Sequence, residues 1–382
     1  MTITPLAAPN PSPSSRPSRI VSLDAFRGLT VAGMILVNNP GDWSHVYPPL
    51  RHAEWHGWTP TDLIFPFFLF IVGVAMPFSF SNRRAKGATT SNLFFHVLFR
   101  SVLLFALGMI LTGIPDFNYS NKLILDVLQR IGVVYLLSAA IVLIARPATQ
   151  FVVGIVCIVV YWALMVLVPV PNHGAGVLAP EGNLWQYVDK IIIEGWHYHA
   201  EGILSLIPSI STVLFGTLTG YWLQSHKDHN EKLVEMFVVG NVGLVLGLIC
   251  HAWFPINKLL WSSSYVLFTA GFALNVLGVC YWLIDVKGFS LWSRPFLVYG
   301  MNAIAVFFLS SLAGRLMGLI KVQQVAATGE TVSVSIKSYM YSYLFAGGAS
   351  TEFTSMVYAI VYVCLWWGIM WIFYKKKLFI KI

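Results

Sequence analysis

The chain is dominated by long apolar runs that no water-soluble core can hold. Ten mostly apolar segments, each about 20 residues long, follow one another from residue 20 to residue 374. A helix of that length crosses the roughly 30 Å hydrocarbon core of a bilayer, since each residue adds about 1.5 Å. Of the 382 residues, 57% are hydrophobic and only 10% are charged, whereas soluble domains carry about 25% charged residues. The sequence therefore predicts an all-α, polytopic integral membrane bundle.

The ten predicted transmembrane helices have approximate bounds that the apolar runs define. They are residues 20–38, 60–80, 92–113, 123–145, 149–169, 204–224, 233–252, 262–284, 295–314 and 355–374. The run from 295 to 320 suits a tilted or broken helix. A re-entrant or interfacial piece within 331–348 would raise the count to eleven.

Lysine and arginine residues orient the predicted bundle. With the N-terminus in the cytoplasm, fourteen of the 24 basic residues fall in cytoplasmic segments, seven in outer segments and three inside spans. This bias follows the positive-inside rule and, with an even number of spans, predicts that both termini are cytoplasmic. It also accounts for the net charge of +8 without nucleic-acid binding, because no basic helix with interleaved aromatic residues is present.

The segments outside the spans divide into one tail and three long loops. Residues 1–19 are rich in Pro and Ser and predict a disordered cytoplasmic tail, because no apolar h-region precedes a cleavage site. Residues 20–382 then form one transmembrane domain. Its long loops, 39–59, 170–203 and 315–354, all fall on the outer side and contain many Trp, Tyr, His and Gly residues. We expect these loops to be ordered and to carry chemistry at the outer face.

The four cysteines lie within apolar runs and lack C-x-x-C spacing. They predict buried thiols, with no disulfide and no metal site.

Charged residues inside predicted spans are costly and normally functional or paired. Asp24 and Arg27 are three residues apart and can share one helix face. Either they form a structural ion pair, or Arg27 joins another arginine to bind an anionic ligand group. Arg100 is expected to snorkel toward the inner interface. Arg130, which follows Gln129, falls in the outer half of its span.

The end of the first span and the loop after it hold residues suited to acyl transfer. Asn38 ends the span, and His52 follows fourteen residues later. A neutral imidazole can take a proton from an attacking amine, and an amide NH₂ can stabilise an oxyanion. Asp62, in the first turn of the second span, has helix capping as its ordinary role. By spacing alone, the competing histidines are His45, His56, His197 and His199.

No G-x-S-x-G, H-E-x-x-H or P-loop pattern occurs, so the corresponding hydrolase and nucleotidase classes lack support.

A further polar group suits sugar binding, because carboxylates and amides accept and donate hydrogen bonds while Trp stacks on sugar rings. An interfacial aromatic belt is the alternative for the tryptophans. The predicted substrate-binding residues are Glu54, Trp55, Asp62, Glu181, Asn183 and Glu201.

Seven stretches, in order from residue 22 to about residue 311, resemble the heparan-alpha-glucosaminide N-acetyltransferase family and its bacterial relatives among the transmembrane acyltransferases. They are SLDAFRGLTVAGMILVNNPG, LRHAEWHGWTPTDLIFPFFLFIVG, LDVLQRIGVVYLL, APEGNLWQYVDKIII, AEGILSLIPSI, LLWSSSYVLFTAG and PFLVYGMNAIAVFFLSS. The resemblance implies an enzyme of the bacterial inner membrane that acetylates an amino sugar on the outer side with cytosolic acetyl-CoA, without a metal.

The resemblance also implies residue roles. His52 matches the catalytic histidine, and Asn38 matches the asparagine that ends the first span. The implied coenzyme-binding residues are Asp24, Arg27, Gln129, Arg130 and Asn302. Glu201 matches the glutamate of an Asp-Pro-Glu-Gly motif, whose Asp and Pro are replaced here by His199 and Ala200.

The expected reaction is direct transfer in a ternary complex, with His52 as general base and Asn38 holding the oxyanion. An acetyl-histidine intermediate is the alternative. Arg27 and Asn38 lie eleven residues apart, about 16 Å along a helix. This distance is similar to the length of an extended pantetheine arm.

The expected acceptor is glucosamine or an envelope-derived saccharide, and homodimers are a further expectation. The rival functions are a transporter of N-acetylglucosamine or related sugars and a purely structural membrane protein, which the polar outer loops disfavour.

Overall fold

The computed structural model describes residues 20–117, 119, 125–192, 201–325, 331–347 and 349–380. The predicted tail of residues 1–19 lies outside the described residues. The long helices are α1 (Val21–Asn38), α2 (Pro60–Arg84), α3 (Thr90–Gly113), α4 (Val127–Ile144), α5 (Pro147–Leu167), α7 (Leu206–Gln224), α8 (His229–Cys250), α9 (Ser263–Tyr281), α11 (Ala303–Leu319) and α13 (Glu352–Lys375). The shorter elements are α6 (Leu184–Ile192), α10 (Arg294–Met301), α12 (Ile336–Tyr341), β1 (Lys321–Val325) and β2 (Thr331–Ser335).

The helices confirm the predicted polytopic helical membrane fold. Within the described residues, nine helices are long and apolar enough to cross a bilayer, and a bent pair brings the number to ten. The pair is Leu291–Met301 and Ala303–Leu319, which meet at 74°. The break that the run from 295 to 320 suggested therefore occurs, and it falls at Asn302. The direction in which the bundle crosses the membrane stays a prediction.

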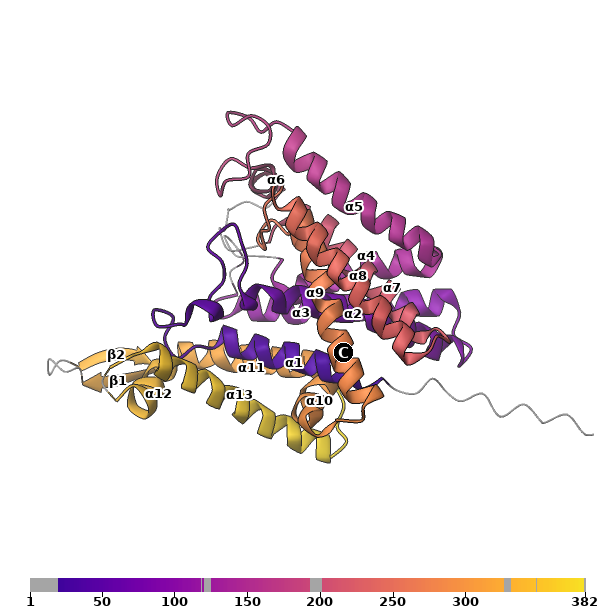
Figure 1. Cartoon of the computed structure of the whole chain (residues 1–382). Helices are drawn as coiled ribbons and strands as arrows, with labels where there is room; N and C mark the ends of the chain where they lie inside the picture. Colours follow the sequence, from indigo (N-terminus) through magenta and orange to yellow (C-terminus); the bar gives the residue numbers. More distant parts are fainter. Residues whose placement is uncertain are drawn as a thin grey trace, which may run out of the picture.

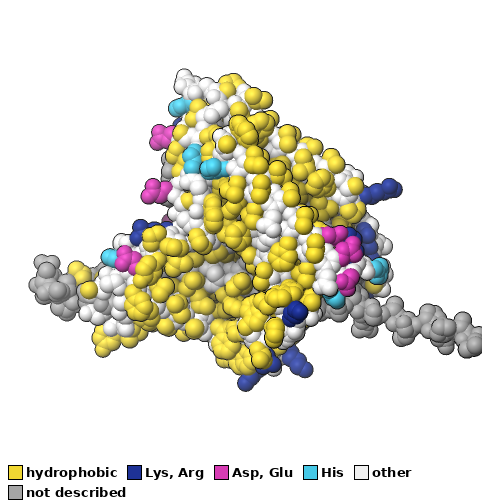
Figure 2. Space-filling view, in the orientation of Figure 1, with side chains coloured by type: hydrophobic (Ala, Val, Ile, Leu, Met, Phe, Trp, Pro, Cys, Tyr) yellow, Lys and Arg dark blue, Asp and Glu magenta, His cyan; other side chains and the backbone are white. Residues whose placement is uncertain are grey.

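The helices divide into a central and a peripheral set. In α2, 72% of the most apolar window is buried inside the protein, whereas the corresponding share is 22–28% in α3, α5, α8 and α13. Figure 2 shows the result on one face, where apolar side chains cover the middle and charged ones gather toward the edges. An apolar belt of this kind is what lipid tails would contact.

Small residues allow the central helices to pack closely. α2 lies against α7, and a Cβ atom on Gly73 would lie 2.1 Å from the carbonyl oxygen of Val213. Gly216 meets the carbonyl oxygen of Phe70 in the same way, at 2.1 Å. Glycine at both positions therefore lets the two backbones touch, as in other membrane helix pairs.

Helix α1 lies beside α11 and α13 (Figure 1) and also packs on α2 and α10. The Asp285 carboxylate, at the end of the α9 segment, accepts hydrogen bonds from the amides of Val21 and Ser22 at 3.1 and 3.0 Å. A carboxylate is stabilising there because the first amides of a helix have no partners within it. This cap fixes the helix that carries Arg27 near its start and Asn38 at its end.

The structure describes the first of the three long loops completely and the other two in part, and their order stays a prediction. The first loop contacts the segment between α8 and α9, where the Gly57 amide donates to the Ile256 carbonyl at 2.8 Å. The second loop contains α6. In the third, residues 315–319 complete α11, and a hairpin of β1 and β2 with Lys321 opposite Ser335 follows. This two-stranded hairpin is the one sheet within the described residues, a small exception to the all-α prediction.

The cysteines are all free thiols. Cys280 is buried as expected, but Cys364 is exposed on α13, so the prediction of a thiol buried within the protein is wrong there. The apolar run around Cys364 faces outward, where lipid rather than protein would cover it.

Candidate active site

His52 and Asp62 form a short hydrogen-bonded pair at the start of α2. His52 Nδ1 lies 2.6 Å from Asp62 Oδ1, and the Asp62 side chain is 1% exposed while that of His52 is 47% exposed. The other Asp62 oxygen accepts hydrogen bonds from the amides of Ala53 and Thr59, both at 3.0 Å. Asp62 thus caps the helix, as predicted, and also orients His52. A carboxylate on Nδ1 favours the tautomer whose Nε2 carries a free lone pair.

Lys258 completes the polar surroundings of His52. Its Nζ lies 3.3 Å from both ring nitrogens of His52, 4.0 Å from Asp62 Oδ1 and 3.9 Å from Glu201 Oε1. The ammonium therefore lies between two carboxylates and along the edge of the imidazole.

Arg130 contacts both the backbone and the side chain of Glu201. The Arg130 side chain is fully buried, and its guanidinium donates to the carbonyl oxygens of Glu201 and Gly202 at 2.7 and 2.9 Å and to the hydroxyl of Ser205. Arg130 Nε also lies 3.9 Å from Glu201 Oε2, and the guanidinium carbon lies 5.4 Å from the centre of the Trp261 ring. These contacts support Arg130 as a residue that positions Glu201, and its predicted coenzyme contact stays a prediction.

One cavity of about 380 Å³ brings most of these groups together, and we call it the site cavity. Its polar and aromatic lining residues are Asn38, His52, Glu54, Trp55, Thr61, Asp62, Phe65, Asp126, Glu201, Lys258 and Phe307. The side-chain amide of Asn38 has no hydrogen-bond partner among the described residues, so it is available to a bound molecule. The predicted catalytic pair, Asn38 and His52, therefore lines one space together with four predicted substrate-binding residues.

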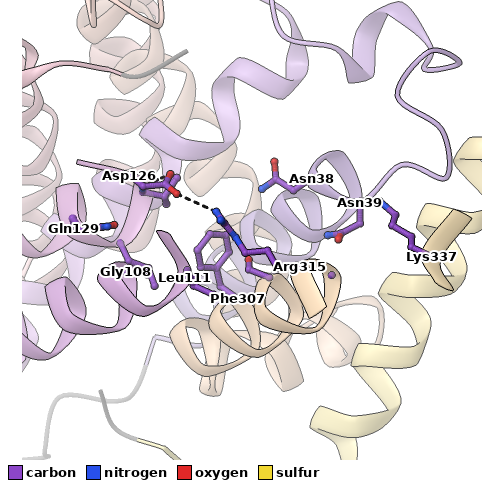
Figure 3. A pocket seen from close by; sticks show the side chains of 13 residues that line it. Asn38, Asn39, Gly108, Leu111, Asp126, Gln129, Phe307, Arg315 and Lys337 are labelled. Carbon is purple, nitrogen blue, oxygen red and sulfur yellow. Dashed lines mark hydrogen bonds and ion pairs between the residues drawn. The ribbon is translucent and has the colours of Figure 1, made fainter. Parts of the chain in front are cut away.

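A second cavity of about 350 Å³, the side cavity, adjoins the first. The two share Asn38, Asp126, Val127 and Phe307. Figure 3 shows the side cavity between α1, α4, α11 and α12, with Gln129 on one wall. Gln129 Nε2 donates to the Thr112 hydroxyl at 3.0 Å.

A third cavity of about 300 Å³, the arginine cavity, is lined by Arg27, Arg83, His96 and Arg100. Arg27 contacts Asp24 at 3.2 Å and the Gly300 carbonyl at 3.5 Å. Arg83 donates to the His96 ring at 2.8 Å, and Arg100 lies 5.4 Å over the Tyr135 ring. Arg27 therefore forms the ion pair with Asp24 and also lines one cavity together with Arg83 and Arg100. Both interpretations, a structural ion pair and an anion-binding residue, stay open.

Two predicted coenzyme or substrate residues serve the fold locally. Asn302, at the helix break, donates to the Leu378 carbonyl at 3.2 Å and accepts from the Ile380 amide at 2.9 Å. Asn183 is buried and caps α6 by accepting from the Gln186 amide at 2.8 Å. Glu181 is exposed beside that cap. None of these contacts tests the predicted binding roles.

The competing histidines lie elsewhere or beyond the described residues. His45 Nδ1 pairs with Asp42 at 2.9 Å, and this pair holds the pKa of the Asp42 carboxyl down at about 2. His56 lies 3.4 Å from the Asn257 amide, and burial lowers the pKa of its ring. His197 and His199 lie outside the described residues.

The model of the heparan-alpha-glucosaminide N-acetyltransferase catalytic family matches residues 19–251 of the chain. The chain belongs to this family. The heparan-alpha-glucosaminide N-acetyltransferase of Mus musculus is 27% identical over 430 residues, which cover 96% of this chain and 61% of that protein. The Homo sapiens protein of the same name is 29% identical over 356 residues, covering 77% of this chain and 53% of that protein. The chain therefore spans little more than half the length of these relatives.

The match to the heparan-alpha-glucosaminide N-acetyltransferase family includes Asn38, His52 and Glu201 but ends before Lys258. Lys258 is not among the predicted site residues, because nothing in its local sequence points to a histidine 206 residues away. Arg83 is likewise predicted only as a basic residue at a cytoplasmic helix end. Its spacing of thirteen residues from His96, across the turn between α2 and α3, was the available signal.

Proposed function

We propose that this protein is a transmembrane N-acetyltransferase, which transfers an acetyl group from acetyl-CoA to the amino group of an amino sugar such as glucosamine. The observation that carries the proposal is the His52–Asp62 pair at 2.6 Å in one cavity with the unpartnered amide of Asn38. Membership of an acetyltransferase catalytic family supports the same reaction.

His52 is the general base in this proposal. Its Nε2 takes a proton from the sugar amine while the amine nitrogen attacks the thioester carbonyl carbon. Asn38 donates a hydrogen bond to the oxyanion that forms. The carbon–sulfur bond then breaks, and the proton on His52 passes to the departing thiolate. Asp62 stabilises the imidazolium between these two transfers.

The arginine cavity suits the charged end of the donor. Coenzyme A carries several phosphate charges, and guanidinium groups bind phosphate oxygens in pairs. Arg27 and Asn38 lie on the same helix, eleven residues or about 16 Å apart. A donor bound with its phosphates at Arg27, Arg83 and Arg100 would direct its thioester toward Asn38. With the N-terminus in the cytoplasm, the phosphates lie inside and the acetyl group meets the acceptor at the outer face.

The test supplies labelled acetyl-CoA and unlabelled glucosamine to the purified protein in detergent. Label should appear in the sugar, and His52→Ala should lower kcat by at least about a hundredfold, the usual contribution of a positioned general base. His45→Ala is the matched control, since His45 pairs with Asp42 away from the cavity, and it should keep the wild-type rate.

Two outcomes contradict the proposal. Equal rates in the His52→Ala and His45→Ala variants would remove His52 from catalysis. Unmodified sugar accumulating in proteoliposomes, with no label transferred, would show a transporter instead.

A further inference from the structure

The side cavity carries a charge opposite to that of the site cavity. In the site cavity the carboxylates of Glu54, Asp62 and Glu201 outnumber the ammonium of Lys258. In the side cavity the charged lining residues are Asp126, Arg315 and Lys337. Because the cavities share Asn38 and Asp126, a molecule in contact with Asn38 lies between an acidic region and a basic one.

Within the side cavity, Lys337 is the cation without a counter-charge. Arg315 pairs with Asp126 at 3.5 Å, which the dashed line in Figure 3 marks. Lys337 reaches from α12 toward the end of α1 and has no ion pair or hydrogen bond through its Nζ among the described residues (Figure 3). Burial alone lowers the pKa of its ammonium. A half-buried cation of this kind is best stabilised by an anion from outside the chain.

Gln129 gives a second and independent sign of a ligand. Its side chain is fully buried, and its Oε1 has no hydrogen-bond partner in the described structure, although its Nε2 does. A buried acceptor without a donor is costly. A Cβ atom at Gly108 would lie 2.2 Å from this oxygen, so glycine there leaves it room. The side cavity thus offers a hydroxyl donor an acceptor next to its cations.

We propose that the side cavity binds an anionic group of the acceptor, a phosphate or a carboxylate, through Lys337 and Arg315. The acceptor is then an anionic amino sugar, with its amine at His52 in the site cavity and its anion in the side cavity. This inference rests on the proposed acetyltransfer. The two cations lie beyond the matched family segment, which ends at residue 251.

The experiment compares kcat/KM for glucosamine 6-phosphate and for neutral glucosamine. The wild-type protein should prefer the phosphate by tenfold or more, and Lys337→Met should reduce this ratio to near one. Lys321→Met is the matched control, because Lys321 is an exposed lysine of the same hairpin region outside the cavity, and it should keep the ratio. A wild-type ratio near one, or a ratio unchanged by Lys337→Met, overturns the inference.

A binding measurement separates this inference from the proposed function. If no acceptor is acetylated, the proposed function fails, and stabilisation of the protein by glucosamine 6-phosphate then tests the side cavity alone. A stabilisation that Lys337→Met removes and Lys321→Met keeps would support it, and its absence in the wild type would overturn it.

A lipid headgroup is the other source of a phosphate. Nanodiscs of phosphatidylcholine with and without phosphatidylglycerol distinguish the two. If the anionic lipid raises the KM for glucosamine 6-phosphate in the wild type and has no effect in Lys337→Met, the cavity holds a lipid phosphate and the acceptor assignment is overturned. An unchanged KM supports the acceptor assignment.

Discussion

Lys258 shows how a side chain distant in sequence completes the surroundings of His52. Its ammonium lies 3.3 Å from both nitrogens of His52 and close to the carboxylates of Asp62 and Glu201. Without this ammonium, the carboxylates of Asp62 and Glu201 would lose the cation that lies between them. Lys258 therefore balances the acidic residues that orient His52.

We predict that Lys258→Met lowers kcat/KM about tenfold or more. The direction follows because the variant removes the contacts of the ammonium with both ring nitrogens of His52 and leaves Asp62 and Glu201 without the cation between them. Values of kcat/KM for acetyl transfer by the purified variant and wild type measure the effect. Lys227→Met is the control, since Lys227 pairs with Glu231 and Glu235 and lies away from the cavity. Equal kcat/KM values in the wild type and Lys258→Met would disprove this role.

At the scale of elements, a short helix holds the backbone that carries Glu201. Asp189 of α6 accepts a hydrogen bond from the Ile203 amide at 2.9 Å. Gly202 lies so close to Asp189 that a Cβ atom there would be 1.7 Å from its Oδ2. The carbonyls of Glu201 and Gly202 then receive the Arg130 guanidinium. Through this chain of contacts α6 helps to fix one wall of the site cavity.

Asp189 makes the stability of this wall depend on pH. Burial raises the pKa of its carboxyl to about 6, above about 3.9 in an unfolded chain. The folded protein therefore binds this proton more tightly than the unfolded chain does. The contribution of the protonated Asp189 carboxyl to the free energy of unfolding is full below about pH 4 and is lost as the pH rises through 6. We expect the Tm in detergent to fall less between pH 5 and 7 in Asp189→Asn, which keeps an acceptor for Ile203, than in the wild type. Parallel Tm curves for the two proteins would contradict this assignment.

The sequence predicted the helices well and the site only in part, for physical reasons. An apolar run of about 20 residues has one stable form in a bilayer, so the ten spans could be located. Asn38 and His52 stood out because they lie close in sequence at one helix end. Lys258 and Arg83 did not, since their partners come from tertiary packing. The break at Asn302 was foreseen as an option, but its 74° angle depends on the packing around it.

At the scale of the whole molecule, the arginine cavity lies near the start of α1, and the site and side cavities lie at its end. The orientation of the bundle in the membrane decides which compartment each end faces. The end of α2 and the turn after it carry Arg83, Arg84 and Lys86, and the positive-inside rule predicts that this end is cytoplasmic. The loop with His52 is then predicted to face the other side.

We predict that, in a cysteine-free background, a membrane-impermeant maleimide labels Ser44→Cys in sealed, right-side-out vesicles. Lys86→Cys should be labelled only after the vesicles are opened. Both positions are exposed in the structure, so accessibility within the protein does not limit either reaction. Labelling in the reverse pattern would place His52 in the cytoplasm and rule out transfer to an outer acceptor.

The surplus of carboxylates around His52 also bears on how turnover ends. In the proposed reaction, the acceptor amine reaches this space as an ammonium ion, which Glu54, Asp62 and Glu201 attract, and it must give up one proton before it attacks. Acetylation converts it into a neutral amide, and that attraction disappears with the charge. The carboxylates that attract the acceptor amine therefore hold the acetylated end of the product more weakly.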